Sequence, residues 1–408
     1  MPRVLITHIG KPREEKTNTE PSSLVPHYQE TTYEINGEKF TTPMIGFGLA
    51  ETTKPDRIIF LGTPGSSWAS LIDVSRFLGN CPREDEEKAL ELMAELETLE
   101  KNDRATAKDL APLGESLRQW LNLPVICQIT PYIESDSRLD TARYLKSLDE
   151  VIEPKDCLLI DVTHGLRYHP MLALLSAQYF AMVRETKLEG IFYGAFDRSS
   201  ADGISPVISL HGMLDVLQWV QALHSFDKDG DYGVFEKLLE EDCVPKEVCA
   251  SMGRAAFFER TSNAAKAKKH LNPIKNYKFN EKIEPLAELF SSALQERLNW
   301  SDATGRGDLE IRLAHEYLKR RDYIRAAAYT QEGYISKRLY QEKEDIDDYE
   351  KRKKLSDSEE NEDFKTLKKI RNSLVHGQRN NGRISRLLGD EESLEKEIKK
   401  LMKKLKTG

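Results

Sequence analysis

The chain has 408 residues, of which 39% are hydrophobic and 31% charged, the composition of a soluble globular protein. This length exceeds one ordinary core, so two domains are expected. The formal net charge of −8 argues against a protein that coats duplex nucleic acid, but not against a local basic cleft for a short single strand. The chain shows neither a bilayer-spanning apolar run nor a signal peptide. A cytoplasmic protein without a membrane partner is therefore expected.

The cysteines show no disulfide or zinc-binding pattern. They are Cys81, Cys127, Cys157, Cys243 and Cys249, and none forms a C-x-x-C pair. An odd number of scattered cysteines in a long chain argues against a disulfide framework and against a zinc site. The sequence also lacks a carboxylate cluster or a His-x-x-His spacing. We therefore predict no metal and no cofactor.

Short apolar runs alternate with helical stretches in the first half of the chain. Strands are expected at 3–10, 56–63, 123–130, 156–165 and 188–196, and helices at about 67–78, 84–101, 108–121, 137–151 and 168–184. Runs rich in Val, Ile and Leu suit parallel strands that are buried on both faces. The repeated strand–helix–strand order predicts a Rossmann-like α/β fold with a mostly parallel sheet.

The segment TTYEINGEKFTT, residues 31–42, has a different pattern. Apolar and polar residues alternate on both sides of Asn36-Gly37. An Asn-Gly pair between alternating runs is a strong hairpin signal. We therefore predict a β-hairpin inserted after the first strand.

The strand signal disappears after residue 226, and the sequence is helical from about residue 230. This change predicts an α/β domain over 1–226 and an all-α domain over 227–408. Residues 345–363 are highly charged with few large apolar side chains, which predicts an exposed, mobile loop. The C-terminal SLEKEIKKLMKKLKTG predicts an amphipathic helix with a solvated basic face.

Four polar loops that contain glycine follow predicted strands: THIGK (7–11), GTPGSSW (62–68), DVTHGLR (161–167) and YGAFDR (193–198). Ligands of open parallel sheets bind at the carboxyl ends of the strands. Glycines allow backbone to approach a ligand, and free N–H groups at a helix start favour phosphate. Trp68 could stack on a base, and the Arg167 fork suits phosphate. The candidate ligand-binding residues are Gly10, Lys11, Gly62, Thr63, Gly65, Ser66, Ser67, Trp68, Thr163, His164, Gly165 and Arg167.

The alternative for each loop is an ordinary turn between a strand and a helix, in which Gly, Ser, Thr and Asp serve the backbone alone. Neither GTPGSSW nor DVTHGLR is a G-x-G-x-x-G or Walker A motif. Several polar loops on one sheet edge nevertheless favour binding. His164 could equally orient its loop or transfer protons.

A second candidate site lies in KKIRNSLVHGQRNNG, residues 368–382. Asn372 and His376 share one helix face, and Arg371 is offset from His376 by about 140°. RNA supplies its own 2′-OH nucleophile, so a histidine for proton transfer and an arginine for the phosphate suffice. Two copies across a twofold axis would bring both pairs together. The alternative is structural, with Arg371 paired to Glu362 or Asp363 and His376 capping the helix. Gly377 is the expected C-cap.

These motifs resemble a known combination of domains. FLGTPGSSW and LLIDVTHGLRYHP resemble the nucleotide-sensing CARF domain of CRISPR-associated proteins, and IRNSLVHG is similar to the catalytic motif of HEPN ribonucleases. The two occur in the order found in the CARF–HEPN effectors of type III CRISPR systems. The resemblance implies a homodimer, open to further assembly, and a cyclic oligoadenylate activator, with cyclic tetra-adenylate favoured.

We therefore interpret the chain as a metal-independent endoribonuclease that cleaves single-stranded RNA, with Arg371, Asn372 and His376 as catalytic residues. The expected products are a 2′,3′-cyclic phosphate and a 5′-hydroxyl. Two alternatives stay open. The first is a ring nuclease that degrades the cyclic oligoadenylate through Thr163, His164 and Arg167, and the second is a nucleotide-sensing scaffold or regulator without enzymatic activity.

Overall fold

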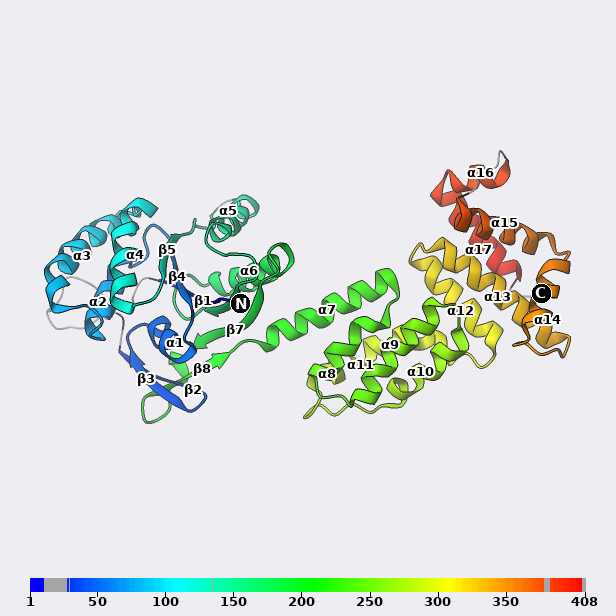
Figure 1. Cartoon of the computed structure of the whole chain (residues 1–408), viewed down its shortest axis with the longest axis horizontal. Coiled ribbons are helices and arrows are strands. Elements are labelled where there is room, and N and C mark those ends of the chain that lie inside the picture. The colour runs from blue at the N-terminus through cyan, green and yellow to red at the C-terminus, as the bar shows by residue number, and fades with distance from the viewer. Residues whose placement is uncertain (11–27, 29, 135, 378–381, 406–408) are drawn as a thin grey trace. The chain divides into compact units, whose positions relative to one another are not determined.

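The computed structural model describes residues 1–10, 28, 30–134, 136–377 and 382–405 (Figure 1). The chain divides into two units, Met1–Leu214 and Asp215–Gly408. The division falls near the start of helix α7 (Gly212–Asp229). It therefore lies N-terminal to the boundary expected at residue 226, which falls near the end of the same helix.

In the described residues of the first unit, eight strands form one sheet in the order β3-β2-β8-β7-β6-β1-β4-β5. All neighbours from β7 to β5 are parallel, whereas β8 is antiparallel to β7. The predicted parallel core is confirmed. The strands are β1 (Arg3–His8), β2 (Thr31–Ile35), β3 (Glu38–Thr42), β4 (Arg57–Gly62), β5 (Val125–Ile129), β6 (Cys157–Asp161), β7 (Lys187–Gly194) and β8 (Ile204–Ser209).

The inserted hairpin is also confirmed. Strands β2 and β3 are antiparallel, and Asn36 and Gly37 between them both have positive φ angles, 52° and 84°. Such angles are the reason that Asn-Gly favours tight hairpin turns. Strand β2 joins the sheet by pairing in parallel with β8.

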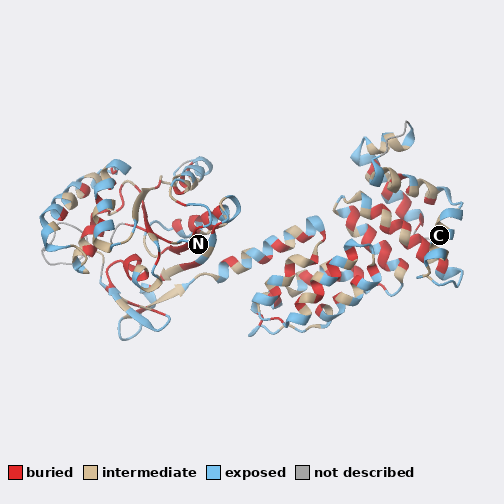
Figure 2. Cartoon of the chain, in the orientation of Figure 1, coloured by how far each residue is buried: buried red, intermediate tan, exposed pale blue. Residues whose placement is uncertain are grey.

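The central strands bury both of their faces. On β1, Leu5 packs into one apolar cluster, while Val4 and Ile6 pack into a second cluster on the opposite face. Helices α1 to α4 contribute to the first cluster and α5 and α6 to the second (Figure 2). The helical elements are α1 (Ile45–Thr53), α2 (Ala69–Phe77), η1 (Arg83–Asp85), α3 (Glu86–Lys101), α4 (Ala107–Leu121), α5 (Ser137–Asp149), α6 (His169–Val183) and η2 (Phe196–Arg198).

The described residues of the second unit are helical and share one apolar core (Figure 2). Helix α13 packs against α12, α14, α15 and α17. In the described parts of both units, none of the helices combines the length and apolar character needed to cross a membrane. The elements are η3 (Tyr232–Phe235), α8 (Glu236–Glu241), α9 (Lys246–Arg260), α10 (Ala264–Asn276), α11 (Pro285–Leu298), η4 (Asn299–Asp302), α12 (Arg306–Lys319), α13 (Tyr323–Gln341), α14 (Tyr349–Ser358), α15 (Glu362–His376), α16 (Arg383–Leu388) and α17 (Glu391–Leu405).

The prediction of a mobile loop over 345–363 is wrong, because Tyr349–Ser358 forms helix α14. None of its residues is fully buried, and polar contacts hold the helix together with the half-buried Leu355, which packs against the core. Asp348 caps its start by accepting a hydrogen bond from the Lys351 amide at 3.1 Å. Charged side chains that hold a helix leave no apolar signal in the sequence.

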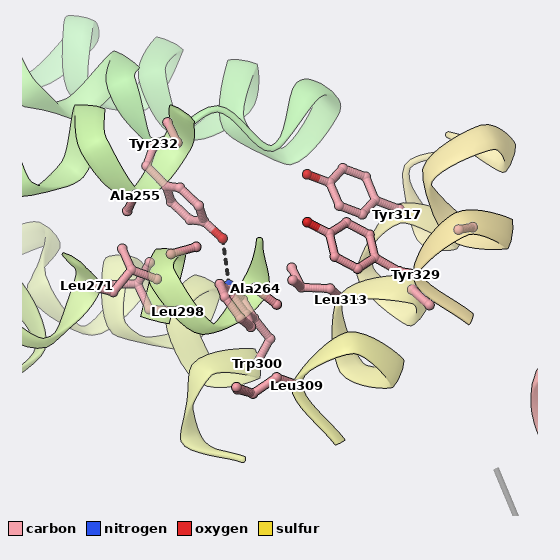
Figure 3. Packing of buried hydrophobic residues seen from close by; sticks show 14 of the residues in the cluster. Tyr232, Ala255, Ala264, Leu271, Leu298, Trp300, Leu309, Leu313, Tyr317 and Tyr329 are labelled. Carbon is pink, nitrogen blue, oxygen red and sulfur yellow. Dashed lines mark hydrogen bonds between the residues drawn. The ribbon is translucent and has the colours of Figure 1, made fainter. Parts of the chain in front are cut away.

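The core of the second unit contains a polar cluster around Glu259, whose side chain is 1% exposed. Tyr317 donates a hydrogen bond to the Glu259 carboxylate, and Tyr329 donates to its backbone carbonyl at 2.6 Å. Figure 3 shows these two tyrosines side by side and Trp300 donating to Tyr232. Burial raises the pKa of Glu259 to about 7, although Tyr317 and Arg320 oppose the shift.

Candidate functional sites

The four predicted ligand loops meet at one edge of the sheet. The Ser67 amide donates to the Gly10 carbonyl at 3.1 Å, and the Gly194 amide donates to Thr163 Oγ1 at 2.8 Å. A Cβ on Gly10 would lie 2.7 Å from the backbone nitrogen of Gly165. The first and third loops therefore touch through their glycines. Lys11 lies outside the described residues.

In the loop after β4, side chains bond to one another. Trp68 is fully buried, and its indole donates to the Thr63 carbonyl at 3.0 Å. Ser66 Oγ accepts from the Thr63 amide at 2.9 Å and donates to the Ile9 carbonyl at 3.1 Å. The expectation that Trp68 stacks on a base is contradicted, because the ring belongs to the apolar core.

The two glycines of this loop make room for protein side chains. A Cβ on Gly62 would lie 2.7 Å from the Trp68 ring, and one on Gly65 would lie 1.6 Å from Asp103 Oδ1. Tyr132 holds that carboxylate through a hydrogen bond of 2.8 Å. An acidic side chain against Gly65 disfavours a phosphate at that point.

The loop after β6 presents more of its residues to solvent. Gly165 and Arg167 are exposed, and Thr163 and His164 are half-buried. Gly165 has a φ of 103°, and a Cβ there would lie 2.4 Å from His169 Nδ1. Only glycine fits this position without strain. This loop is therefore the part of the edge best placed to meet a ligand.

Asp161, at the end of β6, supports that loop from below. Its carboxylate is fully buried and accepts hydrogen bonds from Thr7 Oγ1 at 2.6 Å and from the Thr163 amide at 2.9 Å. It thus ties the end of β1 to the start of the loop. The sequence analysis did not single out Asp161, although an acid directly after a buried strand was a usable signal.

His8 and His169 lie beside Gly165 of this loop, and His164 belongs to the loop itself. His8 and His169 stack with ring centroids 4.7 Å apart, and the His164 ring meets Tyr28 edge-on at 4.8 Å. Burial and then the neighbouring His8 lower the pKa of His169 to about 3, and burial lowers the pKa of His164. These rings are therefore neutral at pH 7. Sequence reasoning found only His164 of this cluster.

The second candidate site lies at the end of helix α15. Asn361 caps the start of the helix by accepting from the amides of Asp363 and Phe364, and Gly377 ends it in the left-handed region with a φ of 62°. The predicted glycine cap is confirmed. Buried Phe364, Leu367 and Ile370 attach the helix to the core.

Arg371 follows this apolar stripe and points at α13. Its Nε donates to Gln331 Oε1 at 3.3 Å, and Gln331 is 3% exposed. The two acids of the structural alternative have other partners, since Glu362 pairs with Lys365 and Asp363 with Lys404. Among the residues that the structure describes, the contact with Gln331 is made through Nε and does not involve the two terminal nitrogens of the guanidinium.

Asn372 is half-buried, and His376 is exposed in the last turn of α15. One chain contributes one Arg371 and one His376, on a single helix. Within the described residues, no group of three or more His, Cys, Asp or Glu side chains is arranged to hold a metal ion.

The comparison with known protein families concerns the first unit. Residues 4–197 match the family model described as CRISPR system endoribonuclease Csx1, CARF domain. The chain is also 24% identical over 253 residues to CRISPR-associated protein MJ1674 of Methanocaldococcus jannaschii, an alignment that covers 59% of this chain and 39% of that protein. The chain therefore spans well under half of that relative. Together the matches show that the first unit is similar to a CARF domain and that the chain is similar to a CRISPR-associated protein.

Proposed function

We propose that this protein is a type III CRISPR-linked ribonuclease, in which the first unit binds cyclic oligoadenylate and the second cleaves single-stranded RNA. One observation carries the catalytic half: Arg371, held by buried Gln331, and exposed His376 occupy the same helix end. The likeness of residues 4–197 to the CARF domain of an endoribonuclease family supports the sensing half.

In the proposed reaction the RNA 2′-hydroxyl gives its proton to solvent water and its oxygen attacks the adjacent phosphorus. The bond from phosphorus to the 5′-oxygen then breaks. The products are a 2′,3′-cyclic phosphate and a 5′-hydroxyl. Arg371 binds the phosphate oxygens and stabilises the charge that develops on them. His376 gives a proton to the leaving 5′-oxygen.

A homodimer supplies the second Arg371–His376 pair of this reaction. A twofold axis brings identical surfaces of two subunits together, so the ends of both α15 helices would face one cleft. Asn372 shares a helix face with His376 and would orient its ring or hold a phosphate oxygen. No metal takes part in this scheme.

The activator is proposed to bind at the loop after β6, where Thr163, His164, Gly165 and Arg167 lie. A cyclic oligoadenylate carries one phosphate for each nucleotide, and Arg167 presents an exposed fork of donors. Cyclic tetra-adenylate is the proposed ring. For the ligand to switch on cleavage, it must bind the active arrangement of the dimer more tightly than the inactive one.

The test is cleavage of a fluorescent single-stranded RNA in EDTA, with and without cyclic oligoadenylates of different ring sizes. We expect cleavage by the wild type with one ring and none by His376→Ala or Arg371→Ala, both of which should keep the fold. Cleavage retained in purified His376→Ala would overturn the assignment of the catalytic residues. Absence of cleavage with every ring would favour the scaffold or regulator alternative.

A second activity, degradation of the cyclic oligoadenylate by the first unit, is favoured by one observation. Nε2 of His164 is buried and has no hydrogen-bond partner among the described residues. A neutral histidine behind a phosphate-binding loop can accept a proton from a ribose hydroxyl. Chromatography of the ring after incubation tests this proposal. If the His376→Ala variant degrades the cyclic oligoadenylate and the His164→Ala variant does not, the activity is established. If the cyclic oligoadenylate stays intact with both variants, the proposal is refuted.

A further inference from the structure

The second unit carries a groove that the proposed catalytic residues do not use. It has a volume of about 580 Å³ and lies between helices α8, α9 and α10. The side chains that matter for its chemistry are Glu236, Arg254, Phe257, Phe258 and His270.

Aromatic rings dominate this groove. Phe258 and His270 stack with centroids 5.1 Å apart and planes 5° from parallel. Phe257 packs edge-on against Phe258 at 5.2 Å and is 56% exposed. A large apolar ring at this exposure leaves much of its surface for contact with a flat partner.

The helices that carry these rings also carry cations. Helix α10 contains four lysines and no acidic residue, in a chain with a net charge of −8. Lys268 and Lys275 are engaged with the Ala303 carbonyl and with Asp302. Lys266 lies over the Phe258 ring at 5.3 Å, and Lys269 is exposed.

Arg254 adds a further exposed cation to the groove wall. Glu236 is the acid among the lining residues and opposes these charges. Among the lining residues Arg254 offsets Glu236, and Lys266 over the Phe258 ring adds a positive charge beside the groove.

We propose that the groove between α8, α9 and α10 binds single-stranded RNA. One unpaired base stacks on Phe257 beside the Phe258–His270 pair, and neighbouring phosphates contact Arg254, Lys266 and Lys269. Exposed rings combined with flanking cations are the recurring means of holding a single strand without reading its sequence. The bases of a duplex are stacked inside and cannot enter. The proposal rests on the proposed function, to which it adds an anchoring site for the substrate.

Binding is measured on the full chain with the His376→Ala substitution, so that RNA is not consumed. The probe is a fluorescein-labelled RNA of about 20 nucleotides, followed by anisotropy. We expect Phe257→Ala to weaken binding about tenfold, as loss of one base–aromatic stack predicts, and Phe257→Tyr to retain wild-type affinity. Leu289→Ala, at a residue of α11 that is 61% exposed, is the matched control and should change nothing.

The charged side chains are tested by salt dependence. Removing both Lys266 and Lys269 should reduce the slope of log affinity against log salt by about 1.4, because each phosphate contact on a single strand contributes about 0.7. Lys399→Ala, at an exposed lysine of α17, should leave the slope unchanged.

Unaltered binding in Phe257→Ala and in the double lysine variant would overturn the proposal. A loss of self-association in Phe257→Ala, seen by light scattering with RNA affinity unchanged, would also overturn it and assign the groove to a second copy. Failure of the proposed function is distinct from both outcomes, because it would show as RNA binding through the groove without cleavage by the wild type.

Discussion

At the scale of single residues, the contact between Arg371 and Gln331 joins side chains that are 40 positions apart. Gln331 is buried in α13, so it offers a fixed acceptor to one edge of the guanidinium. An arginine held at Nε loses fewer rotamers when it binds a phosphate. We infer that Gln331 is a positioning residue for the proposed reaction.

Gln331→Leu should lower kcat for RNA cleavage about tenfold and leave KM nearly unchanged, because Arg371 remains present but is no longer held. Gln331→Glu keeps an acceptor at the same place and should restore most of the rate. Steady-state kinetics on a short RNA provide the measurement. Equal loss of activity and of thermal stability in both variants would indicate a purely structural role.

The burial of Glu259 predicts that the free energy of unfolding depends on pH. Its folded pKa of about 7 lies above the ordinary value of 4.5 because burial disfavours the charged form. The folded chain therefore binds this proton more tightly than the unfolded chain. The resulting stabilisation is complete below about pH 4.5 and is lost as the pH rises through 7, a change of about 3 kcal/mol.

Glu259→Gln keeps the acceptor oxygen for Tyr317 but does not ionise. Relative to the wild type, it should gain about 3 kcal/mol of unfolding free energy between pH 4.5 and pH 8. Urea denaturation of both proteins at the two pH values measures this difference. A difference that stays constant with pH would mean that Glu259 does not titrate with folding.

At the scale of elements, helix α14 is held by Arg352. Its guanidinium donates to Ser336 Oγ at 2.9 Å and to the Ile346 carbonyl at 2.8 Å, and it pairs with Glu332. The Arg352 side chain is 11% exposed. Arg352 thus connects the charged segment to α13, while Lys368 of α15 holds the end of α14 through the Ser356 carbonyl.

Arg352→Ala should detach α14 without unfolding the rest of the chain. Loss of a partly buried, hydrogen-bonded charge costs about 1–3 kcal/mol, and the apolar contact of α14 with the core is limited to the half-buried Leu355. Hydrogen exchange over Tyr349–Ser358 should become faster, whereas Lys353→Ala, at an exposed position of the same helix, should have no effect. Unchanged exchange in Arg352→Ala would show that other contacts hold the helix.

At the scale of the whole molecule, the proposed reaction depends on two subunits. If each active cleft needs Arg371 and His376 from both chains, a dimer of one active and one inactive subunit should not cleave RNA. Mixing wild type with an excess of His376→Ala, followed by subunit exchange, should reduce cleavage below the level expected from dilution. Cleavage proportional to the amount of wild type would instead indicate that one chain forms a complete site.

The sequence by itself determined those elements whose signal is local. The five parallel strands follow from continuous apolar runs, the hairpin from alternation around Asn36-Gly37, and the end of α15 from Gly377. Each depends on the conformational preference of neighbouring residues. Strand β8 and helix α1 were missed, because Pro206 interrupts the former and two glycines weaken the latter.

Only the tertiary structure decided which polar residues face one another. Trp68 and Ser66 point into the protein and form hydrogen bonds within and beside their own loop. His8 stacks on His169, 161 positions away in the sequence, and Arg371 donates a hydrogen bond to Gln331. Such contacts are set by the packing of distant elements. The pattern of nearby residues carries no information about them. The residue types of the candidate sites could therefore be read from the sequence, while their orientation and support required the fold.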